Sequence, residues 1–291
     1  MMNETKKIGV GIAAALAAVP VAFPQQAHAI TYLPEETMAT LEEVLPVAIL
    51  PVTTCLLLVA FAHACYIMGW KNALKFFIPG YIIAWIFEDL SVHAGIVFGF
   101  YYFPEMMGPQ LDVIPFEIPM FWLLCFYCSW YVTNLILDGK PIPTDHSVKR
   151  IIGGALVGGF VLTAMDLTTD PFATANGFWI WPYGGTFFNE PVHNFIGWYV
   201  TGAITLVIHG FIFRRDLTKE PIALSTKGKR ILTCAFVLLY LVESVMFSLM
   251  NVHESLGVPT FLAMGLPAVA ATYKWLVWYF DGRREAKELK A

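Results

Sequence analysis

Long apolar stretches recur along the chain, and they constrain its fold more than any other feature. A run of about 20 apolar residues is long enough to cross the apolar core of a bilayer as a helix. Charged residues make up only 14% of the sequence, whereas soluble domains carry about a quarter. We therefore predict an all-α, polytopic membrane protein with about seven transmembrane helices after a cleaved signal peptide. The expected spans lie approximately at residues 44–68, 73–100, 118–137, 151–170, 194–213, 231–251 and 259–280.

The first 29 residues have the pattern of a secretory signal peptide. Lys6 and Lys7 precede a short apolar core, and the small residues at 27–29 fit a cleavage site. An uncleaved first helix is the alternative, and the prolines within and after the short core argue against it. The expected organisation is thus a signal peptide at 1–29 and a single integral-membrane helical domain at 30–291.

Lysine and arginine residues occupy alternate connections between the expected spans. The loops near 101–117, 171–193 and 252–258 contain neither residue. Basic loops stay in the cytoplasm under the positive-inside rule, so this alternation predicts an N-terminus outside and a C-terminus in the cytoplasm. We expect the protein in the inner or cell membrane of a bacterium. The short basic connections hold Lys71, Lys75, Lys140, Lys149, Arg150, Arg214, Arg215, Lys219, Lys227, Lys229 and Arg230, and Arg283, Arg284 and Lys287 follow the last span.

Two pairs of acidic residues fall within apolar stretches, where an ionised carboxylate costs about 2.5–3.5 kcal/mol. Asp166 and Asp170 are spaced i, i+4 and would share one helical face at the outer end of a span. Two carboxyls this close cannot both ionise cheaply, so one is expected to stay protonated and serve as an acid. Glu88 and Asp89 would point about 100° apart, so we expect one of them to face a cavity. The alternatives are a pair wetted at a helix end and protonated carboxyls that bond between helices.

A polar and aromatic segment follows Asp170 and separates two expected spans. Such a segment is costly at membrane depth unless it lines a cavity, so we interpret it as the floor of a site. The aromatic residues have an alternative role in the interfacial belt at the ends of spans. The candidate residues in and beside this floor are Glu190, His193, Asn194, Trp179, Trp181, Tyr183 and Tyr101.

No sequence pattern predicts a metal or a cofactor. The spans lack HxxxH and HxxHH spacings, which would place two ligands on one helical face. Cys125 and Cys128 have CxxC spacing, but they lie on an expected helix without a second pair, which favours packed thiols. A haem between His93 and His193 is a weaker alternative. The net charge of −4 and the absence of a basic block exclude nucleic acid as an expected partner.

Two segments match motifs of a known family. Residues 98–122 are similar to its FG-x-Y-x-Y…LGP-x-L…VP…IP…W pattern, and residues 166–198 to its D-L-x-x-DP…W-x-W…G…P-x-x-NF-x-GW pattern. Over roughly residues 40–280, the chain resembles the membrane carotenoid biosynthesis family that includes gamma-carotene 1'-hydroxylase and bisanhydrobacterioruberin hydratase. It departs from that pattern at residues 93–95, where members carry Thr-Gly, and at residues 189–193.

The resemblance implies a hydratase that adds water to the terminal C=C of a carotenoid (isoprenoid) ψ-end group without a cofactor. This reaction needs a proton donor, a tertiary carbocation and a captured water. The expected partners are a carotenoid or other isoprenoid lipid substrate, membrane lipid and other carotenoid-pathway enzymes. A non-catalytic carotenoid- or quinone-binding membrane subunit is the main alternative, and a transporter or proton relay is a third.

The expected catalytic residues follow from this chemistry. Asp166 and Asp170 are the first acid and base pair, with Glu88 and Asp89 as support or as the acid itself. The expected substrate-binding set consists of Trp179, Trp181, Tyr101 and Tyr183 along the end-group pocket, Asn194 as a residue that positions water, and Glu190 and His193.

Overall fold

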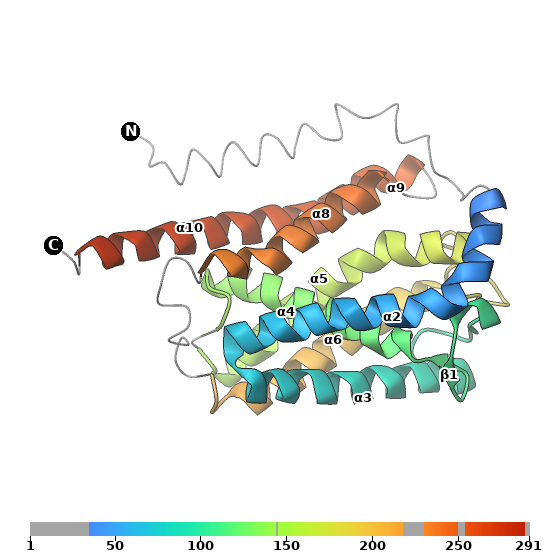
Figure 1. Cartoon of the computed structure of the whole chain (residues 1–291), viewed down its shortest axis with the longest axis horizontal. Helices are drawn as coiled ribbons and strands as arrows, with labels where there is room; N and C mark the ends of the chain where they lie inside the picture. Colours follow the sequence, from blue (N-terminus) through green and yellow to red (C-terminus); the bar gives the residue numbers. More distant parts are fainter. Residues whose placement is uncertain (1–34, 144, 218–229, 250–253, 289–291) are drawn as a thin grey trace.

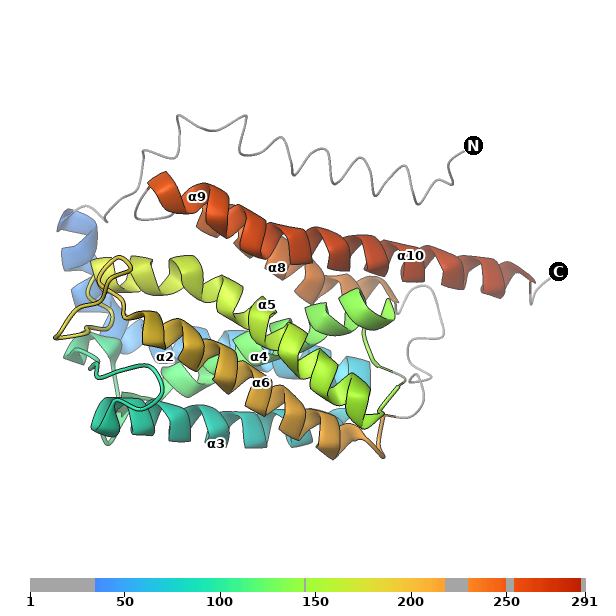
Figure 2. The same ribbon diagram turned by 180° about the vertical axis from the view of Figure 1, so that it is seen from behind.

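The structure is a computed structural model that describes residues 35–143, 145–217, 230–249 and 254–288. Long helices lie lengthwise beside one another, as both views show (Figures 1 and 2). The expected all-α, polytopic membrane protein is confirmed. The α-helices are α2 (Glu35–Met68), α3 (Trp70–Ala94), α4 (Glu117–Asp138), α5 (Val148–Ala175), α6 (Val192–Phe213), α8 (Ala235–Leu249), α9 (Glu254–Thr260) and α10 (Leu266–Glu288).

The remaining elements in the described residues are short. Between α3 and α4 lie the 3-10 turn η1 (Glu105–Met107) and a two-stranded antiparallel pair, β1 (Gln110–Leu111) and β2 (Ile114–Pro115). The 3-10 turn η3 (Ile231–Cys234) leads into α8, and a π-helical turn, η4 (Phe261–Gly265), joins α9 to α10.

Six helical segments in the described residues are long and apolar enough to cross a membrane. They are Val47–Met68, Glu117–Asp138, Val148–Ala175, Val192–Phe213, Ile231–Leu249 and Ser255–Phe280.

The remaining expected span, 73–100, corresponds to α3. This helix packs against α2, α4 and α6, and its polar residues, which include Glu88 and Asp89, reduce its apolar character. It ends at Ala94 rather than at residue 100, because Gly95 adopts a left-handed conformation with φ 67° and caps the last turn.

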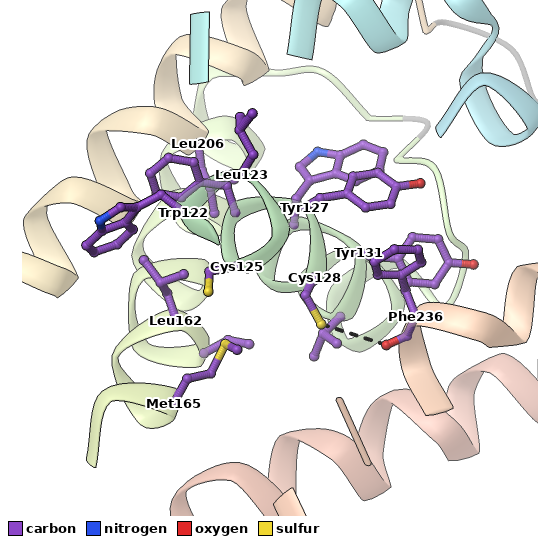
Figure 3. Close-up of a cluster of buried hydrophobic side chains, with 14 of the residues drawn as sticks. Trp122, Leu123, Cys125, Tyr127, Cys128, Tyr131, Leu162, Met165, Leu206 and Phe236 are labelled. Carbon is purple, nitrogen blue, oxygen red and sulfur yellow. Dashed lines mark hydrogen bonds between the residues drawn. The ribbon is translucent and has the colours of Figure 1, made fainter. Parts of the chain in front are cut away.

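Helix α4 is the central element of the bundle. It packs against α2, α3, α5, α6, α8 and α10, and 78% of its apolar window is buried, compared with 17% for α2. Figure 3 shows side chains radiating from α4 into its neighbours. Cys125 and Cys128 belong to this core as buried free thiols, and the Cys128 thiol lies 3.8 Å from the carbonyl oxygen of Phe236. The structure thus contains the packed thiols that the helical context favoured.

Helices α5 and α6 approach each other closely through glycines. A Cβ atom at Gly202 would lie 2.6 Å from the Leu162 side chain, and one at Gly159 would lie 3.0 Å from the Tyr199 carbonyl oxygen. Small residues allow this approach in membrane helices, where packing rather than a hydrophobic drive holds helices together. The close packing places the C-terminal end of α5 beside the N-terminal end of α6, which is where the acidic residues lie.

The two ends of the bundle differ in charge. Lys71 and Lys75 lie at the start of α3, and Lys149 and Arg150 lie at the start of α5. Both helices start at one end of the bundle, and the segments that follow them lie at the opposite end (Figures 1 and 2). The signal peptide expected at 1–29 lies outside the described residues, and the single domain at 30–291 stays a prediction.

Candidate functional site

The two motif segments meet at one end of the bundle. Tyr102, in the segment after α3, forms an antiparallel bridge with Ile180, in the segment after α5, through hydrogen bonds of 3.1 and 3.0 Å. The indole nitrogen of Trp181 donates to the Phe98 carbonyl oxygen at 3.0 Å. Residues about 80 positions apart in sequence therefore form one cover over the helix ends.

A tight turn precedes α6. The backbones of Phe187 and Glu190 bond each other in both directions, at 3.1 and 2.9 Å. The two residues between them, Phe188 and Asn189, have φ values of 49° and 70°. Asn tolerates this left-handed region, whereas a bulky residue such as Phe is strained there. Such strain often accompanies functional sites, and here the turn directs Glu190 into the protein interior, where it is 0% exposed.

Asn194 lies at the centre of a buried cluster of three acidic side chains. Its amide nitrogen lies 2.7 Å from Asp170 Oδ2, 2.7 Å from Glu190 Oε1, and 3.2 and 3.3 Å from the two oxygens of Asp166. All four side chains are at most 3% exposed. One amide group has only two hydrogens to donate, so it cannot satisfy three ionised carboxylates. The cluster must therefore hold protons of its own.

Glu190 lies in the loop before α6, and its electrostatic environment favours the neutral acid. The pKa of Glu190 is raised to about 10, first by burial and then by the nearby Asp170 carboxyl, while the hydrogen bond from Asn194 lowers it. At neutral pH this side chain is a protonated acid.

A fourth acidic residue faces the cluster from α3. Glu88 is 3% exposed and accepts hydrogen bonds from the Trp122 indole nitrogen at 2.6 Å and from the Tyr101 hydroxyl. Glu88 therefore accepts a hydrogen bond at each of its two carboxyl oxygens.

A small cavity separates Glu88 from the cluster. Its open volume of about 30 Å³ has room for a water molecule. Two acids and one amide line it, and the rest of the wall is apolar, mostly aromatic rings. The lining consists of Glu88, Asp170, Asn194, Phe98, Tyr101, Phe103, Ile118, Phe121, Trp122, Trp179, Trp181 and Trp198.

Residues 46–270 match a family described as "Carotenoid biosynthesis protein", and this match includes every residue of the cavity wall. The chain belongs to this family. The resemblance inferred from the two motifs is thereby confirmed.

One curated relative is named bisanhydrobacterioruberin hydratase, from Haloarcula japonica. It is 26% identical to this chain over 129 residues, which are 44% of this chain and 41% of the relative. The match thus spans about two fifths of the relative's length. No solved structure matches the chain.

The structure brings together most of the residues that the sequence indicated. Asp166, Asp170, Glu190 and Asn194 form the cluster. Glu88, Tyr101, Trp179 and Trp181 lie in the cavity wall with Asp170 and Asn194.

Three of the expected site residues lie outside the cluster and the cavity wall. Tyr183 is 88% exposed, and His193 is exposed on the first turn of α6. Asp89 is only half-buried and points to the outer rim, where its carboxylate lies 3.7 Å from His93. The Nε2 atom of His93 lies 2.6 Å from Asp112 Oδ2. This exposed hydrogen bond connects the turn after β1 to α3.

Several wall residues were absent from the expected site. The two motifs could have predicted these wall residues, because each wall residue falls within residues 98–122 or 166–198. They are Phe98, Phe103, Ile118, Phe121, Trp122 and Trp198.

The acidic cluster also has the chemistry of a cation site. Oxygens of Asp166, Asp170 and Glu190 lie within 4.8 Å of one another, and carboxylate oxygens are ligands that Mg²⁺ and Ca²⁺ prefer. The amide nitrogen of Asn194 also lies among these oxygens. Glu190 and His193 have ExxH spacing, but His193 is exposed and does not join the cluster.

Proposed function

We propose that this protein is a hydratase that adds water across the terminal C=C of a carotenoid (isoprenoid) ψ-end group, by acid catalysis and without a cofactor. The observation that carries the proposal is the cavity between Asp170 and Glu88, walled by aromatic rings and large enough for a water molecule. Membership of the carotenoid biosynthesis family and the name of the relative support the same substrate class.

The proposed reaction begins with proton transfer from Asp170. Its Oδ1 atom is buried without a hydrogen-bond partner among the described residues, so a proton that Glu190 passes to this atom would be available to the cavity that Asp170 lines. The π electrons of the terminal double bond take this proton at the less substituted carbon, which leaves a tertiary carbocation at the neighbouring carbon.

Water capture completes the reaction. The oxygen of a water in the cavity bonds to the cationic carbon, and Glu88 accepts the proton that this water loses. One C–H and one C–O bond form, and the π bond is broken. The proton on Glu88 returns to Asp170 before the next turnover, so no oxidant or reductant is consumed.

The remaining wall residues stabilise the intermediates. The rings of Trp122, Trp179, Trp181 and Trp198 surround the position of the cation, and each ring face is worth about 0.5–2 kcal/mol to a positive charge. Tyr101 and Trp122 hold Glu88 in place through hydrogen bonds. Asp166, Glu190 and Asn194 do not need to touch substrate, because they position Asp170 and supply its proton.

The orientation in the membrane is part of the proposal. The N-terminus would be outside and the C-terminus in the cytoplasm of a bacterial cell, with the cavity toward the outer face. The separation of basic residues from the site along the bundle supports this orientation under the positive-inside rule. Other carotenoid-pathway enzymes would then meet this protein within the membrane.

The test is expression in a host that accumulates a carotenoid with free ψ ends, followed by mass spectrometry of the pigments. The expected product gains one water per reacted end, and its oxygen comes from heavy-oxygen water rather than from O₂. Oxygen from O₂ would overturn the proposal in favour of a hydroxylase. Unchanged pigment that co-purifies with the protein would favour the non-catalytic carotenoid- or quinone-binding subunit.

A further inference from the structure

A second, larger cavity lies beside the first. Its volume is about 240 Å³, and its wall comes from α2, η1, α4, α5 and the segment after α5. The lining is largely apolar. Ile49 and Thr53 contribute from α2, while Phe172 and Ala173 contribute from α5. A cavity with this apolar lining suits an apolar chain better than a small polar molecule.

The two cavities share one wall. Ile118, Phe121 and Trp179 line both of them. On α5, Thr169 faces the second cavity while the next residue, Asp170, faces the first. The second cavity therefore lies directly beside the cavity that the proposed proton donor lines.

The second cavity adjoins the lipid-facing side of α2. Val52, the neighbour of Thr53, is 57% exposed, and Leu56 is 54% exposed. In a membrane protein such apolar surface faces acyl chains. A lipid-soluble substrate could thus reach this cavity sideways from the bilayer, without passing through water.

One polar group in the second cavity has no partner. Glu117, the first residue of α4, is 2% exposed, and neither of its carboxyl oxygens has a hydrogen-bond partner on another described residue. Buried polar groups are nearly always hydrogen-bonded, and an orphaned one calls for an explanation. A hydroxyl group on the occupant of the cavity would supply the missing donor.

From these observations we propose that the second cavity holds the polyene chain of the substrate, and that Glu117 accepts a hydrogen bond from a hydroxyl group on that chain. This inference rests on the proposed function, because it takes the reacting end to lie at Asp170. It names the substrate class more narrowly as a hydroxylated isoprenoid polyene.

The first test fills the cavity from α2. Thr53→Trp should lower the amount of polyene that co-purifies with the protein about tenfold or more, since the indole occupies the space of the chain. Val52→Trp adds the same ring on the exposed side of the same helix and should leave bound polyene unchanged. Ala173→Trp fills the cavity from α5 and should repeat the loss. Each variant is compared as monodisperse protein of unchanged helical content.

If the folded Thr53→Trp, Ala173→Trp and Val52→Trp proteins retained equal amounts of polyene, the second cavity would not be the binding site of the polyene chain. Recovery of a membrane acyl chain instead of polyene from the wild-type protein would also overturn this assignment of the second cavity. Asp170→Asn separates this inference from the proposed function, because that variant should lose hydration and still retain polyene. Hydration that survives Asp170→Asn would count against the proposed acid. The Trp variants would still show whether the polyene chain binds in the second cavity.

The second test concerns Glu117. Wild-type protein should favour a polyene with a hydroxyl group over the matched hydrocarbon by about tenfold in a binding competition, which is at the upper end of the range for one ordinary net hydrogen bond. Glu117→Leu keeps the volume and removes the acceptor, so it should bind both molecules equally. A preference that is unchanged in Glu117→Leu would overturn the role of this residue.

Discussion

Asn194 donates to Asp170 over a distance of 2.7 Å, and the same amide nitrogen lies 2.7 Å from Glu190. A single residue on α6 therefore connects the acid at the end of α5 to the acid in the loop before α6. This connection makes the three acids one hydrogen-bonded cluster rather than three independent side chains.

Replacement of Asp170 by Asn should remove the proposed proton donor. We expect hydration to fall about 10²–10⁴-fold, the usual contribution of a positioned acid, while the protein still folds. Mass spectrometry of the pigments measures the effect. Asp89→Asn is the matched control, because Asp89 lies outside the cavity and its replacement should leave turnover near the wild-type level. Loss of turnover in Asp89→Asn together with normal turnover in Asp170→Asn would assign the acid role to Asp89 on α3.

Replacement of Tyr101 by Phe should weaken the support of Glu88. Loss of one hydrogen bond to the carboxyl is worth about 1.5–3 kcal/mol, so we expect turnover to fall at least about tenfold with little change in bound substrate. Tyr102→Phe is the control, since Tyr102 is 47% exposed. Equal turnover in the two variants would show that the hydroxyl of Tyr101 plays no part in the reaction.

Replacement of Asn194 by Leu should destabilise the protein. The change leaves buried acids without their donor, at a cost of about 1–3 kcal/mol for each unsatisfied group. A lower thermal unfolding midpoint in detergent, relative to wild type, is the expected result. His193→Leu changes the exposed neighbour and should have a much smaller effect. If both variants unfolded alike, Asn194 would not hold the cluster together.

The pKa of Glu190 predicts how stability depends on pH. The folded protein holds this proton up to a pKa of about 10, above the ordinary value of 4.5. The unfolded chain releases it earlier, so the contribution of Glu190 to stability is complete at low pH and declines as pH rises through this window. Glu190→Gln, which cannot ionise, should gain stability relative to wild type as the pH increases from 6 to about 9. Unfolding curves that shift in parallel would contradict the assigned protonation state.

Dialysis against a chelator should leave hydration unchanged, because the proposed reaction needs only protons and water. The measurement compares turnover before and after treatment with EDTA. A loss that added Mg²⁺ or Mn²⁺ restores would place a metal ion among Asp166, Asp170 and Glu190, whose oxygens are close enough together to bind one.

Local spacing accounts for part of the site. The i, i+4 spacing of Asp166 and Asp170 predicts a shared helical face, and the structure has both residues bonded to Asn194. The same local rule could not choose between Glu88 and Asp89. That choice depends on which side of α3 meets α4 and α6, a property of helix packing that a single helix does not contain.

Other parts of the site depend on contacts between distant segments. Exposed Tyr183 and buried Trp181 lie in the same aromatic segment, and only the bond from Trp181 to the Phe98 carbonyl oxygen separates their roles. Glu190 enters the cluster because Phe188 and Asn189 adopt positive φ angles. Composition gives no sign of Phe in that conformation, since the surrounding structure imposes it.

The sequence by itself determined the membrane class, the helical fold and the family, because each follows from local properties: apolar length, spacing and motif. The tertiary structure decided which acids face each other and which rings enclose them. It also decided that the cavity of Asp170 adjoins the cavity of Glu117. These relationships arise from the packing of α2, α3, α4, α5 and α6, in which distances between residues far apart in sequence are set by the shapes of all the side chains between them.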